Sequence, residues 1–460
     1  MTDKIPPHIH EIVEKFSSAG YEIFLVGGSV RDLLNNRKVT DWDLTTSATP
    51  EQMLVLFPDS LYENNFGTVG IKAPDLPETE HKGLVEVTTF RTEKGYKDSR
   101  HPDKVEWGKT VEEDLGRRDF TINAMALRLA SLTQGKLPDY NIIDPYNGQE
   151  DLKKNIIRAV GDPDLRFKED ALRLMRAIRF ASQLGFSIEE ETLEAITQDA
   201  GLLKNIAFER VRDELMKILA SEFPYEGIML LKNTGLLSLI LPELEEGIGI
   251  SQMRPGRHHV DDVFTHNVLS LKFTTSTDPI VRFATLIHDI GKPKVKNSDN
   301  DGLVIFHNHE IAGAKIARNV TERLRFSKKE QEKIIKLVRW HMFTVDEHIT
   351  DSAVRRFIRR IGVENVKDMM DLRVGDRLGG GTQTAESWRL KLFKKRLDEQ
   401  MAPAPFSIND LAIDGKDIMK ELKIKPGPKI GEILQKLFEE VDEDLEKNNK
   451  EFLLQRIHEI

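Results

Sequence analysis

The chain has 460 residues, a length that predicts roughly three or four domains with substantial cores. It contains no cysteine, which excludes disulfide bonds and thiolate metal sites, so any metal must be held by histidines and carboxylates. The net charge of −9 excludes a uniformly basic surface, so RNA binding would need locally concentrated Lys and Arg.

The chain also lacks the apolar segments that a membrane protein needs. No run of about 18 apolar residues occurs. The first residues, MTDKIPPHIHEIVEKF, lack the apolar core of a signal peptide. We therefore expect a cytoplasmic protein with no membrane partner.

The first predicted strand and helix form a candidate phosphate site. The apolar run 21–26 predicts a strand, and Gly27 and Gly28 mark a place where the backbone must approach a bulky group. The helix after them would direct its free N–H groups to the same place. Arg31, one turn into this helix, adds a guanidinium suited to phosphate oxygens. A Gly-Gly pair by itself is more often a simple turn, so a phosphate site needs further polar groups nearby.

A predicted strand at 40–46 carries two aspartates one residue apart. Because strand side chains alternate, Asp41 and Asp43 share one face and Trp42 lies on the other. Paired carboxylates suit hard divalent cations such as Mg²⁺. Glu86, on a later predicted strand, is either a third carboxylate of this site or a partly exposed strand charge.

A polar loop and a predicted helix come next. Residues 92–108 are punctuated by Gly and Pro, which predicts a loop. Residues 112–127 read as a helix. Its Arg117, Arg118 and Asp119 cannot all lie on the apolar side, so they form either a solvated charge cluster or a polar site.

A long helical region begins at 167–186 and runs to about residue 245. Asp170 and Arg173 are three apart, hence neighbours on one helix face, and Arg176 and Arg179 continue that ridge. A carboxylate accepts hydrogen bonds and a guanidinium only donates them. Such a pair can match the amino donor and ring-nitrogen acceptor of cytosine and adenine. Guanine and uracil present the reverse order and would leave buried polar groups unpaired, at about 1–3 kcal/mol each. The alternative is a set of salt bridges on an exposed helix.

From about residue 250, histidines and aspartates accumulate on successive predicted helices. A His-Asp dyad follows five apolar residues, and imidazole with carboxylate suits transition-metal ions or magnesium. The residues of this predicted metal centre are His266, His288, Asp289, His309, His341 and Asp376.

The C-terminal part contains a basic stretch. Residues 351–400 carry 12 Lys and Arg against 8 Asp and Glu, which favours a surface for a phosphate backbone, with a solvated helix face as the alternative. A Pro-Gly-Pro turn at 426–428 then leads into a helix, another potential phosphate contact.

The ordered string GGSVRDLL…TDWDLTTSATPE resembles the head domain of DNA polymerase β-like nucleotidyltransferases. Within that superfamily it is similar to the class II branch, which contains tRNA nucleotidyltransferases (CCA-adding enzymes) and bacterial poly(A) polymerases. The resemblance implies an α+β fold, in which a head with a small mixed sheet and helices precedes all-α neck, HD and tail domains. The implied boundaries are 1–145, 146–248, 249–380 and 381–460.

The same resemblance implies roles for the residues of the first half. Glu169 would orient Arg173, and Tyr96, Asp98, Arg100 and Pro102 of the loop favour addition of A. Mg²⁺ would be held by Asp41 and Asp43. The implied catalytic residues are Asp41, Asp43 and Glu86, and the implied nucleotide-binding residues are Gly28, Arg31, Arg118, Asp119, Asp170, Arg173, Arg176 and Arg179.

The histidine series resembles an HD phosphohydrolase domain. His266, His288, Asp289 and Asp376 match its core metal ligands, and His309 and His341 match the extra pair of two-metal versions. The metal could be Mg²⁺, Mn²⁺, Ni²⁺ or Fe²⁺. Such domains in CCA-adding enzymes are associated with phosphatase, 2′-nucleotidase and 2′,3′-cyclic phosphodiesterase activities.

The predicted function is template-independent addition or repair of the 3′-terminal CCA of tRNA from CTP and ATP, with release of pyrophosphate. The partners are then the tRNA 3′ end, ATP and CTP. The alternatives are a bacterial poly(A) polymerase or A-adding enzyme, an HD-type phosphohydrolase whose head only docks RNA, and a non-catalytic RNA-binding module. The oligomeric state stays open.

Overall fold

The structure is a computed structural model, and it describes residues 5–62, 67–73, 83–94, 104–129, 141–252, 262–300, 303–343, 345–346, 348–401 and 407–460. The chain divides into two compact units, Met1–Pro242 and Glu243–Ile460. Within the described ranges, no helix combines the length and the apolarity needed to cross a membrane. The finer division at residues 145, 248 and 380 stays a prediction.

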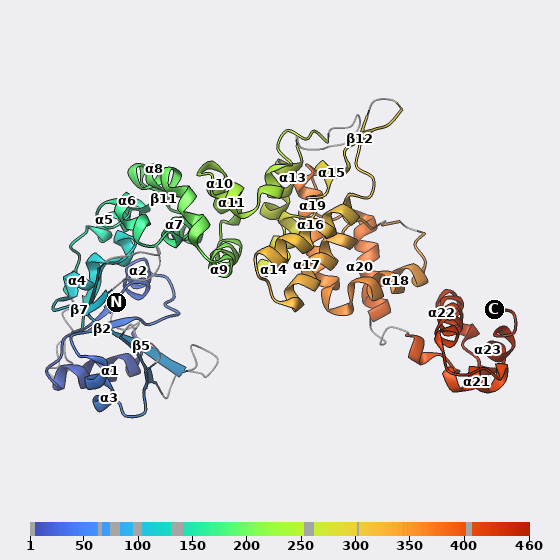
Figure 1. Cartoon of the computed structure of the whole chain (residues 1–460), viewed down its shortest axis with the longest axis horizontal. Coiled ribbons are helices and arrows are strands. Elements are labelled where there is room, and N and C mark those ends of the chain that lie inside the picture. The colour runs from blue at the N-terminus through green and yellow to red at the C-terminus, as the bar shows by residue number, and fades with distance from the viewer. Residues whose placement is uncertain are drawn as a thin grey trace. The chain divides into compact units, whose positions relative to one another are not determined.

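A mixed sheet forms the centre of the first unit (Figure 1). Its strand order is β3-β4-β5-β2-β1-β8-β9, in which β2 and β5 are parallel and the other described pairs are antiparallel. The strands are β1 (Ile23–Val26), β2 (Leu44–Thr46), β3 (Leu61–Tyr62), β4 (Thr68–Lys72), β5 (Leu84–Thr89), β8 (Ala126–Arg128) and β9 (Asn141–Ile143).

Short helices and one more strand pair accompany this sheet. The helix α1 buries Ile9, Ile12, Val13 and Phe16, whose spacing of three and four residues makes one apolar stripe. The predicted mixed α+β head is thus confirmed. The elements are α1 (Pro7–Ser18), α2 (Gly28–Leu34), α3 (Pro50–Leu56), the paired strands β6 (Arg91–Lys94) and β7 (Lys104–Trp107), α4 (Val111–Gly116) and α5 (Gly148–Lys154).

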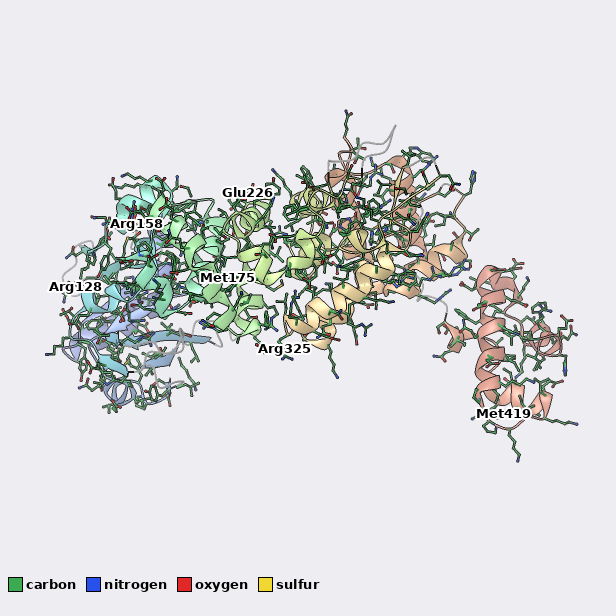
Figure 2. All side chains as sticks on the ribbon, turned by 45° about the horizontal axis from the view of Figure 1, so that its top comes forward. Arg128, Arg158, Met175, Glu226, Arg325 and Met419 are labelled. Carbon is green, nitrogen blue, oxygen red and sulfur yellow. The ribbon has the colours of Figure 1, made fainter. Side chains whose placement is uncertain are left out.

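The rest of the first unit is mainly helical. Its central helix α7 is buried over most of its length, and Met175 on it is fully enclosed (Figure 2). The elements are β10 (Ile156–Ile157), α6 (Pro163–Glu169), α7 (Leu172–Leu184), β11 (Ser187–Ile188), α8 (Glu190–Asp199), α9 (Phe208–Leu219), α10 (Pro224–Asn233) and α11 (Leu236–Ile240).

Two segments predicted as single helices are interrupted. Residues 167–186 break at Asp170, which adopts an extended backbone and accepts the N–H of Leu172 at 3.0 Å. Residues 112–127 contain only α4, a 3-10 turn and β8, and Asp119 accepts the N–H of Phe120 at 2.9 Å. In both places an aspartate side chain takes a backbone N–H and so competes with helix formation. The predicted strand at 40–46 likewise begins only at Leu44.

The second unit is almost entirely helical. Its elements are α12 (Pro242–Glu245, at the junction of the units), α13 (Val263–Phe273), α14 (Pro279–Leu286), α15 (Lys292–Val295), β12 (Asn297–Ser298), β13 (Val304–Ile305), α16 (His309–Arg323), α17 (Lys328–Trp340), α18 (Asp351–Ile361), α19 (Val366–Gly379), α20 (Trp388–Met401), α21 (Gly415–Leu422), α22 (Pro428–Glu443) and α23 (Lys450–Arg456).

Two glycines allow α13 and α19 to pack closely. A Cβ on Gly375 would lie 2.5 Å from the carbonyl oxygen of Ser270, and one on Gly379 would clash with the same residue. This approach brings His266 of α13 next to Asp376 of α19, with 3.3 Å between Nε2 and Oδ1.

The tail helices are joined to α18 by an ion-pair cluster. The buried Asp442 of α22 accepts from Arg355 Nε at 2.8 Å and from Arg359 Nη1 at 3.0 Å. Two arginines of the basic stretch 351–400 therefore have structural partners. The RNA-binding surface predicted for this stretch stays a prediction.

Candidate active site and metal centre

Every residue predicted for the nucleotide site lines one cavity of about 750 Å³ in the first unit. It is therefore the single place where the carboxylates and the basic side chains of the predicted site meet. Its charged lining consists of Asp32, Asp41, Asp43, Glu86, Asp119 and Asp170 together with Arg31, Arg91, Arg117, Arg118, Arg173, Arg176, Arg179 and Arg210.

The sheet register brings two of the three candidate metal-binding carboxylates side by side. Leu44 of β2 pairs with Val87 of β5 in parallel, so one step back along both strands places Asp43 beside Glu86. Asp41 is exposed and Trp42 is buried, although both precede β2, and Asp41 lines the same cavity as Asp43 and Glu86. Three carboxylates in one cavity suit hard divalent cations.

The paired glycine lets charged groups approach the backbone. Gly27 has φ +68°, and a Cβ there would lie 2.8 Å from Arg118 Nη1 and 3.5 Å from Asp43 Oδ2. Arg31 forms a two-pronged pair with Asp32, both bonds at 2.9 Å, and donates to Asn123 Oδ1 at 2.8 Å. These contacts fix the guanidinium at the cavity wall.

A buried carboxylate that sequence reasoning missed holds two of the arginines. Asp114 is fully enclosed and accepts from Arg117 Nη2 at 2.8 Å and from Arg118 Nη2 at 3.1 Å. Burial alone would raise the pKa of Asp114, but the two guanidinium groups outweigh burial and lower it. Asp114 is acidic residue i to basic residues i+3 and i+4, a spacing that could have identified it.

Asp119 pairs with Arg176 across the cavity lining. Arg176 Nε donates to Asp119 Oδ2 at 2.7 Å, and Asn123 also donates to this carboxylate. Burial would raise the pKa of Asp119, but Arg176 and Arg173 outweigh it and lower the value to about 2. Asp119 is therefore ionised at neutral pH.

The segment predicted to read the base is held by specific partners. Arg210 of α9 donates to Asp170 Oδ2 at 3.2 Å. Arg173 lies 2.5 Å from Glu169 Oε2, the orienting contact that the family resemblance implied, and donates to the carbonyl oxygen of Arg117 at 3.0 Å. Asp170 and Arg173 line the same cavity although they do not share one continuous helix face.

Arg179 has a buried partner on α9 that sequence reasoning also missed. Its Nη1 donates to Glu214 Oε1 at 2.9 Å, and both side chains are buried. Burial and neighbouring arginines lower the pKa of Arg179. Glu214 lies in the apolar stripe of Val211, Leu215 and Ile218, and a charge in such a stripe is a signal that could have identified this buried pair.

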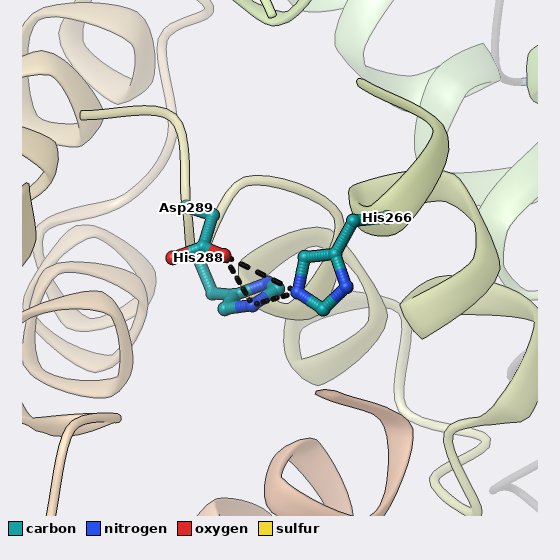
Figure 3. Close-up of side chains that lie close together, drawn as sticks. All are labelled: His266, His288 and Asp289. Atoms are coloured by element: carbon teal, nitrogen blue, oxygen red, sulfur yellow. Dashed lines mark hydrogen bonds and ion pairs between the residues drawn. The ribbon is translucent and has the colours of Figure 1, made fainter. Parts of the chain in front are cut away.

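In the second unit, the predicted histidines and aspartates converge around Asp289, and Figure 3 shows His266 and His288 beside it. Its Oδ2 lies 3.2 Å from His266 Nε2 and 3.3 Å from His288 Nε2. Its other oxygen, Oδ1, lies 3.1 Å from His309 Nε2 and 3.5 Å from His341 Nε2. The one carboxylate thus joins two histidine pairs.

Backbone carbonyls orient three of these rings. The Nδ1 atoms of His288, His309 and His341 lie 2.8, 2.8 and 2.7 Å from carbonyl oxygens. Because a carbonyl only accepts, each Nδ1 must carry the proton, which directs the Nε2 lone pair of a neutral ring inward.

The donor set fits divalent metal ions. His266 and His288 bring their Nε2 atoms to 3.1 Å from each other, and His309 and His341 bring theirs to 3.3 Å. Facing lone pairs at such distances require a shared proton or cation. Burial would lower the pKa of His288, but Asp289 and Asp376 outweigh it and raise the value to about 10. Two groups of three ligand atoms, one from His266, His288 and Asp289 and one from Asp289, His309 and His341, each suit one cation.

The loop residues predicted to favour addition of A, namely Tyr96, Asp98, Arg100 and Pro102, lie outside the described residues.

Comparison with protein families assigns most of the chain. Residues 23–158 match the model "Poly A polymerase head domain". Residues 185–248 match "Probable RNA and SrmB- binding site of polymerase A", and residues 303–457 match "tRNA nucleotidyltransferase domain 2 putative".

Individual relatives extend over nearly the whole chain. A CCA-adding enzyme of Limosilactobacillus reuteri is 32% identical over 98% of this chain and 95% of its own. An A-adding tRNA nucleotidyltransferase of Deinococcus radiodurans is 35% identical over 90% of each. The crystal structure of the Bacillus stearothermophilus CCA-adding enzyme in complex with CTP superposes with a TM-score of 0.73 at 27% identity, covering 99% of this chain and 98% of that one. Full-length identity of this degree, with the site described above, makes the chain a nucleotidyltransferase of the family that unites tRNA nucleotidyltransferases and poly(A) polymerases.

Proposed function

We propose that the chain adds or repairs the 3′-terminal CCA of tRNA with CTP and ATP, without a nucleic-acid template. One observation carries this proposal: a single cavity is lined both by the carboxylates Asp41, Asp43 and Glu86 and by the base-reading candidates Asp170 and Arg173. The names of the CCA-adding relatives, and the CTP complex of one of them, support it.

The carboxylates serve the transfer step. Asp41 and Asp43, with Glu86 beside them, would hold Mg²⁺ ions, which supply acidification of the tRNA 3′-hydroxyl and charge neutralisation at the α-phosphate. The 3′-oxygen then bonds to the α-phosphorus while the bond to pyrophosphate breaks.

The arginines of the cavity hold the triphosphate. Arg118 is fixed by Asp114, and its buried Nε has no hydrogen-bond partner within the described part of the chain. It therefore has a donor to offer to a phosphate oxygen. Arg31 and the backbone at Gly28 line the same place, and Arg176 and Arg179 support the site from α7.

Asp170 and Arg173 select the base. Each carboxylate oxygen accepts more than one hydrogen bond and a guanidinium has five donors, so both side chains can keep their protein partners and still contact a base. Cytosine and adenine match this donor and acceptor order, whereas guanine and uracil leave buried polar groups unpaired, at about 1–3 kcal/mol each.

The test is incorporation of labelled CTP and ATP into tRNA that ends at the discriminator base, at C, or at CC. A CCA-adding enzyme extends all three and stops at CCA. Failure to extend any of them, or uptake of GTP and UTP at equal rates, contradicts the proposal.

Addition of A alone is the second candidate, because the Deinococcus relative is an A-adding enzyme. It predicts extension only of tRNA ending in CC. A long A tail on any RNA would instead identify a poly(A) polymerase.

We also propose that the second unit is a metal-dependent phosphohydrolase of the HD type. The specific observation is that the two oxygens of Asp289 face different histidine pairs, the arrangement that a two-metal centre needs. Mg²⁺, Mn²⁺, Ni²⁺ and Fe²⁺ are the candidate ions, and the candidate substrates are phosphate monoesters and 2′,3′-cyclic phosphates. Metal analysis followed by hydrolysis assays with each ion tests this; a chain that holds metal and hydrolyses neither class contradicts it.

A further inference from the structure

A second cavity, of about 540 Å³, opens beside the His/Asp centre. Four metal-ligand candidates and the bridging carboxylate of Asp289 form one side of it. Three cations and a group of apolar side chains also line it. Its lining includes His266, Asp289, His309, His341 and Asp376, the cations Lys292, Arg373 and Arg377, and the apolar Phe306, Met342 and Phe343.

Two of the three cations are already neutralised by the centre. Lys292 Nζ lies 2.5 Å from Asp289 Oδ2 and donates to Gln252 Oε1 at 2.7 Å. Arg373 Nη1 donates to Asp376 Oδ2 at 2.7 Å. Both side chains therefore support ligand carboxylates and have little charge left for another anion.

Arg377 differs from these two. It follows the ligand candidate Asp376 directly in α19 and lines the cavity, and within the described ranges it has no ion-pair partner. Its Nε is buried without a hydrogen-bond partner among the same residues. An orphaned guanidinium nitrogen costs stability unless a ligand completes its bonding.

The position of Arg377 is fixed by packing. The helix α19 lies against α13 at Gly375 and Gly379, so the backbone that carries Arg377 cannot shift without moving the centre itself. The carbonyl of Arg377 also accepts from Thr382 Oγ1 at 2.6 Å. The backbone at Arg377 is thus held in place before a ligand arrives.

We propose that Arg377 is the residue that binds the phosphate group of the substrate at the His/Asp centre. This rests on the proposed phosphohydrolase function and adds the group that recognises the substrate. A guanidinium donates two parallel hydrogen bonds to a phosphate and remains charged throughout. Water adds its oxygen to phosphorus, the ester P–O bond breaks, and the alcohol leaves with a proton, while Arg377 gives up none.

The test measures binding rather than turnover. Inorganic phosphate is titrated by calorimetry into the full chain loaded with Mn²⁺, and bound Mn²⁺ is counted by elemental analysis. Arg377→Met should weaken phosphate binding about 10- to 100-fold, the loss expected for charge-assisted hydrogen bonds, with the Mn²⁺ content unchanged. Arg377→Lys should recover part of the affinity, since it restores the charge without the fork.

Lys367→Met is the matched control, because it removes an exposed cation earlier on the same helix. It should leave phosphate binding unchanged. The proposal is overturned if Arg377→Met binds phosphate as tightly as wild type, if it loses Mn²⁺, or if the wild-type chain binds no phosphate. A wild-type chain that binds phosphate through Arg377 but hydrolyses no ester supports the binding site and defeats the phosphohydrolase proposal alone.

Discussion

Single charged residues in the first unit are placed by partners far away in the sequence. Arg179 and Glu214 are 35 residues apart and both buried. Glu169 and Arg173, by contrast, are four apart, and the family resemblance implied that contact. Spacing predicts pairs within a helix turn, whereas a pair between α7 and α9 depends on how the helices pack. Only the charge within the apolar stripe of α9 signals it.

Glu214→Ala should destabilise the protein strongly, because it leaves the Arg179 guanidinium buried without its partner. The free energy of unfolding should fall by about 3–5 kcal/mol in urea titrations. Lys217→Ala, which removes the more exposed partner of Glu214, should cost no more than about 1 kcal/mol. Equal decreases in the free energy of unfolding of the two variants would show that the buried Arg179–Glu214 pair contributes no more than the exposed one.

The Asp119 carboxylate makes part of the stability depend on pH. Its pKa is lowered to about 2 in the folded chain from an ordinary 3.8. Its contribution is therefore present above about pH 4 and is lost as the pH falls towards 2, and it amounts to about 2 kcal/mol. The free energy of unfolding of Asp119→Asn should lie below that of wild type by this amount at pH 7. The two curves should converge near pH 2; a constant gap would contradict the assignment.

At the scale of elements, apolar periodicity in the sequence predicts the strands and long helices, but it does not predict the breaks between them. The strand alternation predicted around Trp42 does not occur, because β2 begins only at Leu44, yet Asp41 and Asp43 still line one cavity. The breaks within residues 112–127 and 167–186 were not predicted because Asp119 and Asp170 accept backbone N–H groups there. Whether such a side chain caps a helix or stays in it depends on its surroundings, here Arg176 and Arg210.

Gly375→Ala tests whether the α13–α19 contact sets the metal centre. The added Cβ would lie 2.5 Å from the Ser270 carbonyl, so the helices must separate and His266 moves away from Asp376. We expect a loss of about 1–3 kcal/mol in unfolding and weaker Mn²⁺ binding by calorimetry. Gly431→Ala in α22, where nothing lies within 4 Å, is the control. It should stabilise by up to about 1 kcal/mol and leave Mn²⁺ binding intact.

At the scale of the whole molecule, the two candidate sites belong to different compact units, which predicts independent chemistry. Asp41→Ala should abolish incorporation of CTP and ATP and leave ester hydrolysis unchanged. Asp289→Ala should abolish ester hydrolysis and leave incorporation of CTP and ATP unchanged. Loss of both activities in either single variant would show that the units depend on each other.

The order of motifs along the chain predicted the family and the α+β head, because the types of the motif residues and their spacing can be read directly from the sequence. The contacts that join the motifs in space were not predictable. Asp114, Arg210 and Glu214 are partners that the sequence did not single out, and they determine how the arginines of the cavity are held.

One arginine connects two tasks of the first cavity. Arg173 is a candidate for reading the base, and it also donates to the backbone of Arg117, next to the candidate triphosphate ligand Arg118. A mismatched base that displaces Arg173 should therefore also shift the backbone at Arg117 and, with it, the neighbouring Arg118, which aligns the leaving pyrophosphate. A mismatched nucleotide that binds should then react slowly. The enzyme would discriminate between bases in the rate of bond formation as well as in nucleotide affinity.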